Sequence, residues 1–193
     1  MLTDPVILSA IDILAPTVRI PSGCSIDPKA LLIAMTGNES SWGSNCAPRL
    51  ELGYYRGGAY YLKPSNDWLR KLVTKYEECA AMSWGPWQIM FPVAYELGYK
   101  GTAHAHPWGL YEPEISLQWV IEYLNKRTFR VWDQAPTAKL VPVATTVAQV
   151  GDSYNTGSFR DMNHNPKYEH DLELHYAEAV SQLYPQQPPM AVT

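Results

Sequence analysis

The sequence predicts a mainly helical protein with one small loop or hairpin insert, and three observations support that prediction. Apolar residues recur at helical spacing in several segments that Gly and Pro separate. A chain of 193 residues with 46% hydrophobic content can bury the core of one domain. No internal repeat and no change of composition divides the chain. We therefore expect a single domain over residues 1–193, with its core over about 27–184.

An Asp-Pro pair starts each of the first two predicted helices. These helices cover about residues 4–14 and 27–43. Asp is a favoured N-cap residue, and Pro fits the first helical turn, where its missing N–H is not needed. Pro16 stops the first helix, and Trp42-Gly43 is expected to end the second. The second helix carries Glu39 in its last turns.

The remaining elements follow from composition and periodicity. Residues 45–63 are dense in Gly and Tyr, which predicts the loop or hairpin. Helices are predicted over about 65–81, 91–97, 112–126, 140–150 and 168–183. A turn is expected to hold Tyr154 and Asn155. Residues 185–193 are rich in Pro and are expected to form a flexible tail.

Charge and hydropathy exclude several classes of partner. The net charge of −4 and the absence of a basic stripe argue against nucleic-acid binding. No apolar run is long enough to cross a bilayer, and the first residues lack the basic region of a secretory signal. We expect a monomer that is synthesised in the cytoplasm without a signal peptide and does not insert into membranes.

The Cys and His residues do not predict a metal site or a cofactor. Three cysteines do not form an even disulfide framework, so free thiols are expected at Cys24, Cys46 and Cys79, with a Cys46–Cys79 bridge as the alternative. The histidines lack the spacing of a zinc helix and are interpreted as solvent-facing or packing residues. No Gly-rich segment continues as a phosphate-binding loop.

Glu39 is the most informative residue of the chain. It follows an apolar helical run and shares a helix face with Leu32, Met35 and Thr36. A carboxyl on such a face is desolvated, which disfavours its charged form and allows it to serve as a general acid near neutral pH. The alternative interpretation is an ordinary surface glutamate at the end of a helix.

Four short segments carry a family resemblance, which covers about residues 27–184. In chain order they are Glu39-Ser40, Gly85-Pro86-Trp87-Gln88-Ile89, Tyr154-Asn155-Thr156-Gly157 and Tyr168. Together they resemble the lytic transglycosylases related to soluble bacterial murein transglycosylase and goose-type lysozyme. The sequence departs from the family pattern at Pro86-Trp87, where Leu-Met is common, and at Ser153, where Ala usually stands. These departures bear on subsite specificity more than on the reaction class.

The resemblance implies a lysozyme-like helical fold and a reaction on peptidoglycan. Glu39 would be the general acid/base that cleaves the β-1,4 bond between N-acetylmuramic acid and N-acetylglucosamine. The sugar's own 6-hydroxyl would then attack and leave a 1,6-anhydro-muramic end, with no cofactor. A chain that lacks a signal sequence and acts on cell wall is expected to be a phage endolysin or a virion-associated lysin.

The resemblance also assigns supporting roles to other residues. Gly85 would allow close backbone approach, and Gln88 with the Ile89 backbone would form the floor of the substrate site. An amide that only stabilises a turn is the alternative for Gln88. Tyr154 and Asn155 would orient the acid and bind the N-acetyl group, with helix capping as the alternative.

Two further assignments concern Tyr168 and Ser40. Tyr168 would donate a hydrogen bond to the catalytic carboxyl, and Ser40 would stabilise the helix end or the neighbouring loop. Five aromatic residues have two interpretations, either as surfaces on which sugar rings stack or as core residues: Trp42, Trp84, Trp87, Tyr54 and Tyr55.

The type of reaction depends on whether the site has a second carboxylate. No Asp occurs between Glu39 and Asp67, so Glu51 is the nearest candidate. A salt bridge with Arg49 or Arg56 is the alternative interpretation of Glu51. If Glu51 or a held water supplied a base, the protein would be a lysozyme-type hydrolase. A non-catalytic glycan-binding or virion structural protein is the third hypothesis.

Overall fold

The computed structural model of the chain describes residues 4–103, 105–129, 144–156 and 165–185. The described chain is mainly helical, which confirms the predicted class. Its α-helices are α1 Pro5–Leu14, α2 Pro28–Ser40, α3 Asp67–Tyr76, α4 Phe91–Leu97, α5 Pro113–Tyr123, α6 Val147–Thr156 and α7 Pro166–Leu183. A π-helical turn, η7 Leu124–Thr128, continues α5. Short 3₁₀ segments are η1 Ala15–Thr17, η2 Leu52–Tyr54, η3 Pro64–Asn66, η4 Glu77–Ala81, η5 Tyr99–Gly101 and η6 Pro107–Tyr111.

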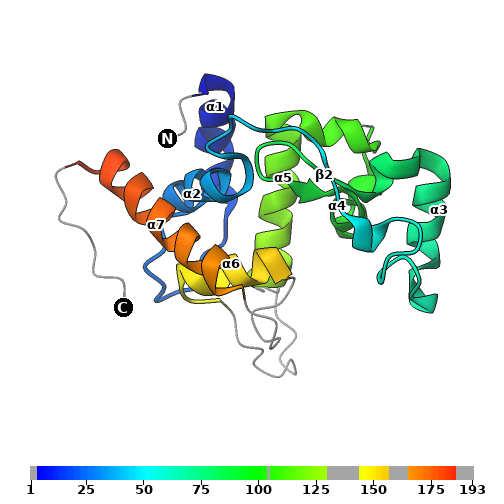
Figure 1. Cartoon of the computed structure of the whole chain (residues 1–193). Coiled ribbons are helices and arrows are strands. Elements are labelled where there is room, and N and C mark those ends of the chain that lie inside the picture. The colour runs from blue at the N-terminus through cyan, green and yellow to red at the C-terminus, as the bar shows by residue number, and fades with distance from the viewer. Residues whose placement is uncertain (1–3, 104, 130–143, 157–164, 186–193) are drawn as a thin grey trace.

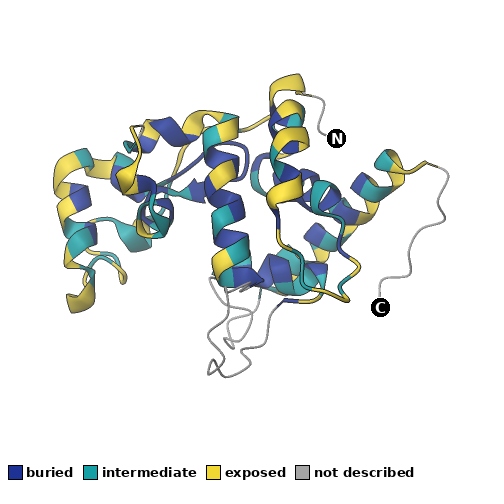
Figure 2. Cartoon of the chain, turned by 180° about the vertical axis from the view of Figure 1, so that it is seen from behind, coloured by how far each residue is buried: buried dark blue, intermediate teal, exposed yellow. Residues whose placement is uncertain are grey.

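Helix α5 passes through the middle of the molecule (Figure 1). On one side lie α1, α2, α6 and α7, and on the other lie α3 and α4. Helices α2 and α7 pack against each other, as do α6 and α7. Buried positions run along α5 where it faces both groups (Figure 2). One hydrophobic cluster reaches from Ile7 in α1 to Ala179 in α7.

The first two helices begin as predicted. The Asp4 carboxylate accepts a hydrogen bond from the Val6 N–H at 2.8 Å, and the Asp27 carboxylate accepts one from the Ala30 N–H at 2.7 Å. Each side chain therefore satisfies an N–H group that has no partner within its helix. The expected end of the second helix, at Trp42-Gly43, is slightly late, because α2 ends at Ser40.

A small antiparallel sheet replaces the predicted hairpin. Its strands, in the order β1-β2-β3, are β1 Arg49–Leu50, β2 Met82–Trp84 and β3 Ile89–Met90. Strand β1 comes from the 45–63 insert and pairs with β2, with Leu50 opposite Met82. The hairpin of the structure joins β2 to β3 instead. The prediction of a loop was therefore correct, and the alternative of a hairpin within the insert was wrong.

Two helices of the structure end at other residues than the sequence predicted. The helix expected over 65–81 ends at Tyr76, because Glu77 adopts a positive φ of 51° and a 3₁₀ segment follows. Part of the predicted 140–150 helix lies outside the described residues. The described helix α6 runs further than predicted, so Tyr154 and Asn155 lie in its last turn rather than in a loop turn.

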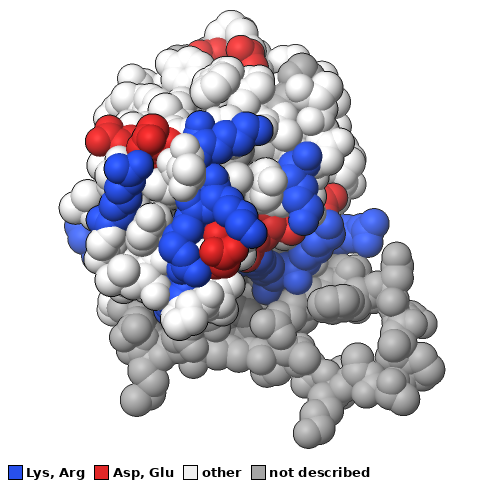
Figure 3. All heavy atoms as spheres, turned by 90° about the vertical axis from the view of Figure 1, so that its right-hand side faces the viewer, with Lys and Arg blue, Asp and Glu red and all other residues white. Residues whose placement is uncertain are grey.

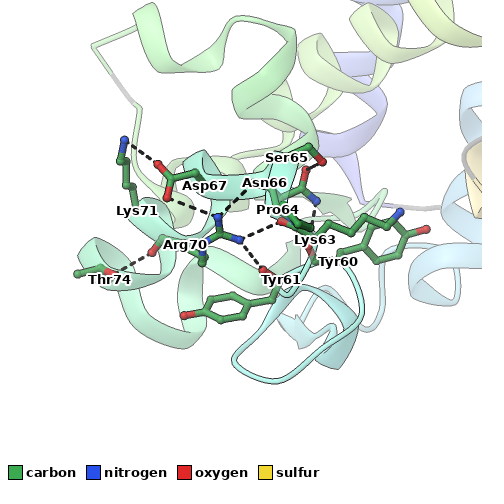
Figure 4. A network of polar contacts seen from close by, with 10 residues as sticks. All are labelled: Tyr60, Tyr61, Lys63, Pro64, Ser65, Asn66, Asp67, Arg70, Lys71 and Thr74. Carbon is green, nitrogen blue, oxygen red and sulfur yellow. Dashed lines mark hydrogen bonds and ion pairs between the residues drawn. The ribbon is translucent and has the colours of Figure 1, made fainter.

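The insert is fastened to the start of α3 (Figure 4). The Arg70 guanidinium donates to the carbonyl oxygens of Tyr61 at 3.1 Å and Lys63 at 2.9 Å. The Asn66 amide donates to the Tyr60 carbonyl at 2.9 Å. Because one arginine serves several loop carbonyls, a Gly-rich segment with little regular structure keeps a defined position beside α3.

Three other predictions concern cysteines, the tail and the membrane. All three cysteines are free thiols, as expected. The predicted flexible tail falls mostly on residues outside the described part of the chain. In the described part, no helix has both the length and the apolar character that a bilayer crossing needs.

Candidate active site around Glu39

Glu39 lies in the last turn of α2, immediately before an abrupt change of backbone direction. Ser41 and Trp42 have φ values of 50° and 61°, and Gly43 follows at 81°. The buried Ser40 hydroxyl donates to the Thr36 carbonyl at 3.1 Å and accepts from the Gly43 N–H at 3.0 Å. Ser40 thus stabilises the helix end, as predicted, and fixes the point from which the Glu39 side chain extends.

The Tyr168 hydroxyl donates a hydrogen bond to Glu39 Oε1, as the resemblance implied. The two residues meet because α2 and α7 pack side by side (Figure 1). No hydrogen bond joins the other carboxyl oxygen, Oε2, to any described residue. One oxygen is therefore held by Tyr168, and the other has no hydrogen-bond partner among the described residues.

Burial raises the pKa of Glu39 from 4.5 to about 7. The Tyr168 hydrogen bond and the Arg49 charge lower this pKa, and the Glu51 charge raises it, but desolvation is the largest cause. The residue is only half-buried, so part of it stays accessible. A group with this pKa populates both its acid and its base form at neutral pH, as general acid/base catalysis requires.

Tyr154 lies close enough to Glu39 to respond to its charge, but it does not hydrogen-bond the carboxyl. Its hydroxyl donates to the Trp87 carbonyl at 2.8 Å, and its ring packs edge-on against Tyr123. Burial, followed by the Glu39 charge, raises the pKa of Tyr154 well above 10. The Tyr154 hydroxyl is therefore bound to Trp87, and the expected orientation of the acid by Tyr154 stays a prediction.

Asn155 faces solvent one position further along α6. Its side-chain oxygen accepts a hydrogen bond from the Asn165 amide at 3.0 Å, and the residue is exposed. No hydrogen bond joins Asn155 to Glu39 in the described structure. The side chain amide of Asn155 remains accessible to a ligand that approaches α6.

The turn between β2 and β3 is built around Gly85. Its φ is +74°, and a Cβ at this position would lie 2.6 Å from the Leu110 carbonyl oxygen. Any side chain would therefore both strain the backbone and overlap a neighbouring segment. The predicted close backbone approach is present, although the approaching group is η6 of the same protein.

The Gln88 side chain is bound within the protein. Its Oε1 accepts from the Ser83 hydroxyl at 2.9 Å, and its Nε2 donates to the Gly85 carbonyl at 3.0 Å and the Ala47 carbonyl at 3.3 Å. Gln88 is 6% exposed, and Ile89 next to it is 3% exposed and pairs with Trp84. This geometry matches the alternative of an amide that stabilises a turn, and it fastens the hairpin to the insert.

Glu51 forms the predicted salt bridge. Its Oε1 lies 2.7 Å from Arg49 Nε, and the Ser83 hydroxyl approaches the same oxygen at 3.4 Å. The other candidate partner, Arg56, pairs with Glu77 instead. Arg49 and Glu51 act on Glu39 with opposite signs, so the pair places a balanced charge beside the acid rather than a free carboxylate.

Two residues that the sequence did not single out hold Tyr168 in place. Asn38 donates through Nδ2 to the Tyr168 carbonyl at 3.0 Å, and its Oδ1 lies 2.6 Å from His175 Nδ1. Burial lowers the pKa of His175, so its neutral form with a proton on Nδ1 fits this contact. His175 also packs edge-on against Trp42. Tyr168 and His175 are seven positions apart, which places them on one face of α7 and is the signal that could have revealed this contact.

The five aromatic residues interpreted as surfaces for sugar rings or as core residues differ in how far they are buried. Trp84 is 6% exposed and Trp87 is completely buried, with its indole N–H donating to the Leu32 carbonyl at 3.0 Å. Core packing is therefore the role of both. Trp42, Tyr54 and Tyr55 are half-buried, and Tyr54 stacks on Tyr60 at 4.6 Å.

The Glu39 cluster consists of Glu39 with Asn38, Ser40, Arg49, Glu51, Tyr154, Tyr168 and His175. No group of three His, Cys, Asp or Glu side chains in the described segments could hold a metal ion. A shallow pocket of about 310 Å³ is lined by residues of α1 and by one glutamate of α5, none of which belongs to the Glu39 cluster. Comparisons with protein-family models, curated proteins and solved structures found no match to this chain.

Proposed function

We propose that the protein is a lysozyme-like lytic transglycosylase that cleaves the bond between N-acetylmuramic acid and N-acetylglucosamine in peptidoglycan. One observation carries the proposal. Glu39 is a half-buried carboxyl whose pKa is raised to about 7, with one oxygen held by Tyr168 and the other without a hydrogen-bond partner in the described structure. The four motif segments and their order support the same assignment.

In the proposed reaction, Glu39 first acts as an acid and then as a base. Protonated Oε2 donates its proton to the departing glycosidic oxygen, and the bond from that oxygen to the muramic C1 breaks. The carboxylate then accepts the proton of the 6-hydroxyl as that oxygen bonds to C1. Glu39 regains its proton, no water is consumed, and a 1,6-anhydro end results. Tyr168 stabilises the carboxylate between the two steps by donating to Oε1.

The structure of the Arg49–Glu51 pair favours this intramolecular reaction over hydrolysis. A hydrolase needs a second carboxylate to activate water or to attack the sugar. Glu51 is the nearest candidate, yet it is bonded to Arg49 and approached by Ser83. The oxygen engaged by Arg49 is held at a fixed place in the protein and is not free to take a proton from an attacking water.

Mass spectrometry of digested, purified peptidoglycan tests the proposal. We expect anhydro-muramic ends, which are lighter by one water than hydrolysed ends. Reducing muramic ends would instead establish the hydrolase. The Glu39→Gln variant should still sediment with peptidoglycan but release no fragments. Release by this variant would refute the role of Glu39, and absence of release by the wild-type chain would favour a non-catalytic glycan-binding or virion protein.

A phage-encoded lysin that acts on the cell wall is the setting that we propose for this activity. The proposed partner is the peptidoglycan strand, and no cofactor takes part in the reaction as derived. Peptidoglycan with intact stem peptides and glycan strands stripped of them should be compared as substrates. The comparison shows whether the peptides are required.

A further inference from the structure

An exposed aromatic surface lies beside α3, outside the Glu39 cluster. Trp108 in η6 is 55% exposed, which is unusual for the largest apolar side chain. His106 stacks on the Trp108 ring, with centroids 4.6 Å apart and an interplanar angle of 24°. The Tyr76 ring meets Trp108 edge-on at 6.2 Å. The indole is therefore held in one orientation and presents a fixed face to solvent.

The supporting residues of this surface are themselves anchored. The Tyr76 hydroxyl donates to the Ala105 carbonyl at 3.1 Å. His106 Nδ1 accepts from the Gly109 N–H at 3.0 Å, which fixes the imidazole at the start of η6. A surface built in this way loses little side-chain entropy when a ligand binds, and rigid aromatic groups of this kind are favoured in binding sites.

Two lysines lie over tyrosine rings of the aromatic group that includes Tyr76. The Lys75 ammonium lies 4.8 Å from the Tyr76 ring centroid, and the Lys100 ammonium lies 5.9 Å from that of Tyr95. The Phe91 ring contacts both tyrosines, with centroids 5.5 Å from that of Tyr76 and 5.8 Å from that of Tyr95, so the two lysines belong to one aromatic group. Neither lysine forms an ion pair with an acid in the described structure, whereas the neighbouring Lys71 pairs with Asp67 at 2.8 Å.

The charge of this surface contrasts with that of the whole chain. The net charge of the protein is −4, yet Lys and Arg predominate on the face that carries α3 (Figure 3). Lys75 and Lys100 each lie over an aromatic ring and form no ion pair in the described structure, so their ammonium groups can bind a carboxylate of a ligand. A flat aromatic face beside available ammonium groups fits a ligand that combines sugar rings with carboxylates.

We propose that Trp108, Tyr76, Lys75 and Lys100 form a second glycan-binding surface for peptidoglycan. In this proposal, which depends on the proposed function, a sugar ring stacks on Trp108 while lactyl or stem-peptide carboxylates bind Lys75 and Lys100. Segment η6 links this surface to the hairpin, because the Leu110 carbonyl approaches Gly85. The surface would retain the enzyme on its polymer without taking part in bond cleavage.

Sedimentation with purified peptidoglycan tests this surface, with Glu39→Gln present in every variant so that the polymer stays intact. Adding Trp108→Ala should weaken binding about fivefold, as expected for loss of one aromatic contact of about 1 kcal/mol. Adding Lys75→Ala and Lys100→Ala should weaken binding similarly at low salt and have less effect at high salt. Lys71→Ala, on the same helix, and Leu174→Ala, at an equally exposed apolar site, are the matched controls and should not change binding.

Peptidoglycan whose carboxylates have been converted to amides identifies the bound group. Its binding should be weakened for the parent protein and should no longer depend on the two lysines. Equal binding by the Trp108 variant and its parent would overturn the proposed surface, as would a parent that does not sediment at all. Anhydro product formation by the wild-type chain is measured separately. The failure of this surface is therefore distinguishable from failure of the proposed function.

Discussion

Replacing Glu39 with Gln should stabilise the protein, and by an amount that depends on pH. The folded-state pKa of Glu39 is about 7, against 4.5 for the unfolded chain. Between these values the folded state holds the proton more strongly, so the free energy of unfolding falls as pH rises. The shift corresponds to roughly 3 kcal/mol, because each pKa unit is worth about 1.4 kcal/mol. This destabilisation is absent below pH 4.5 and complete above pH 7.

The Gln variant removes the titratable carboxyl and keeps a side chain of nearly the same shape. Its amide oxygen can still accept the hydrogen bond from Tyr168. Thermal unfolding of both proteins should therefore give similar Tm values near pH 4, and at pH 8 the variant should unfold roughly 6–12 °C higher, from about 2–4 °C per kcal/mol for a chain of this size. Glu114→Gln, at an exposed position of α5, is the control and should show no such divergence. A constant Tm difference across this pH range would refute the conclusion that Glu39 is desolvated. This test does not depend on which substrate the protein acts on.

Three other predictions concern the Glu39 cluster and the proposed activity on peptidoglycan. Tyr168→Phe removes a hydrogen bond that lowers the pKa of Glu39, so the fall of kcat/KM above about pH 7 should move to higher pH in a pH profile. Gln88→Ala should lower the free energy of unfolding by about 2 kcal/mol in denaturant titration, because Ser83 and two carbonyls lose their partner. Glu51→Gln should leave the anhydro product and its rate nearly unchanged, and a loss of about 100-fold or more would instead indicate a second catalytic group.

The sequence predicted the elements that depend on local signals. The Asp-Pro starts of α1 and α2 were recognisable because an N-cap side chain acts within three residues of itself. The end of α3 was not recognisable, because the residue with positive φ that ends it is Glu77 rather than the Gly or Asn that usually signals such a backbone. The pairing of β1 with β2 was also missed. Strands of two and three residues have too little periodicity to reveal a partner more than thirty positions away.

The candidate site was predicted unevenly for the same reason. The resemblance supplied the Tyr168 contact, whereas spacing alone could not, since 129 positions separate it from Glu39. The side chain of Gln88 matches the alternative of a turn amide, because its polar atoms bind within the hairpin and to Ala47 of the insert. Asn38 and His175 stayed unnoticed. The seven-residue spacing of Tyr168 and His175 was the one available sign, and it indicates a shared face of α7 without indicating Asn38 as the partner.

The environment of Glu39 follows from how two helix ends are arranged. Helix α2 ends in residues of left-handed backbone, so the chain leaves the helix without covering the carboxyl on every side. Helix α7 begins opposite this end and supplies Tyr168, whose carbonyl is held by Asn38 and whose hydroxyl reaches Oε1. Because burial raises the pKa of Tyr168 well above 10, the hydroxyl remains a donor at every pH at which Glu39 titrates. A single carboxyl can then change its protonation state while its geometry stays fixed, as the role proposed for Glu39, first acid and then base, requires.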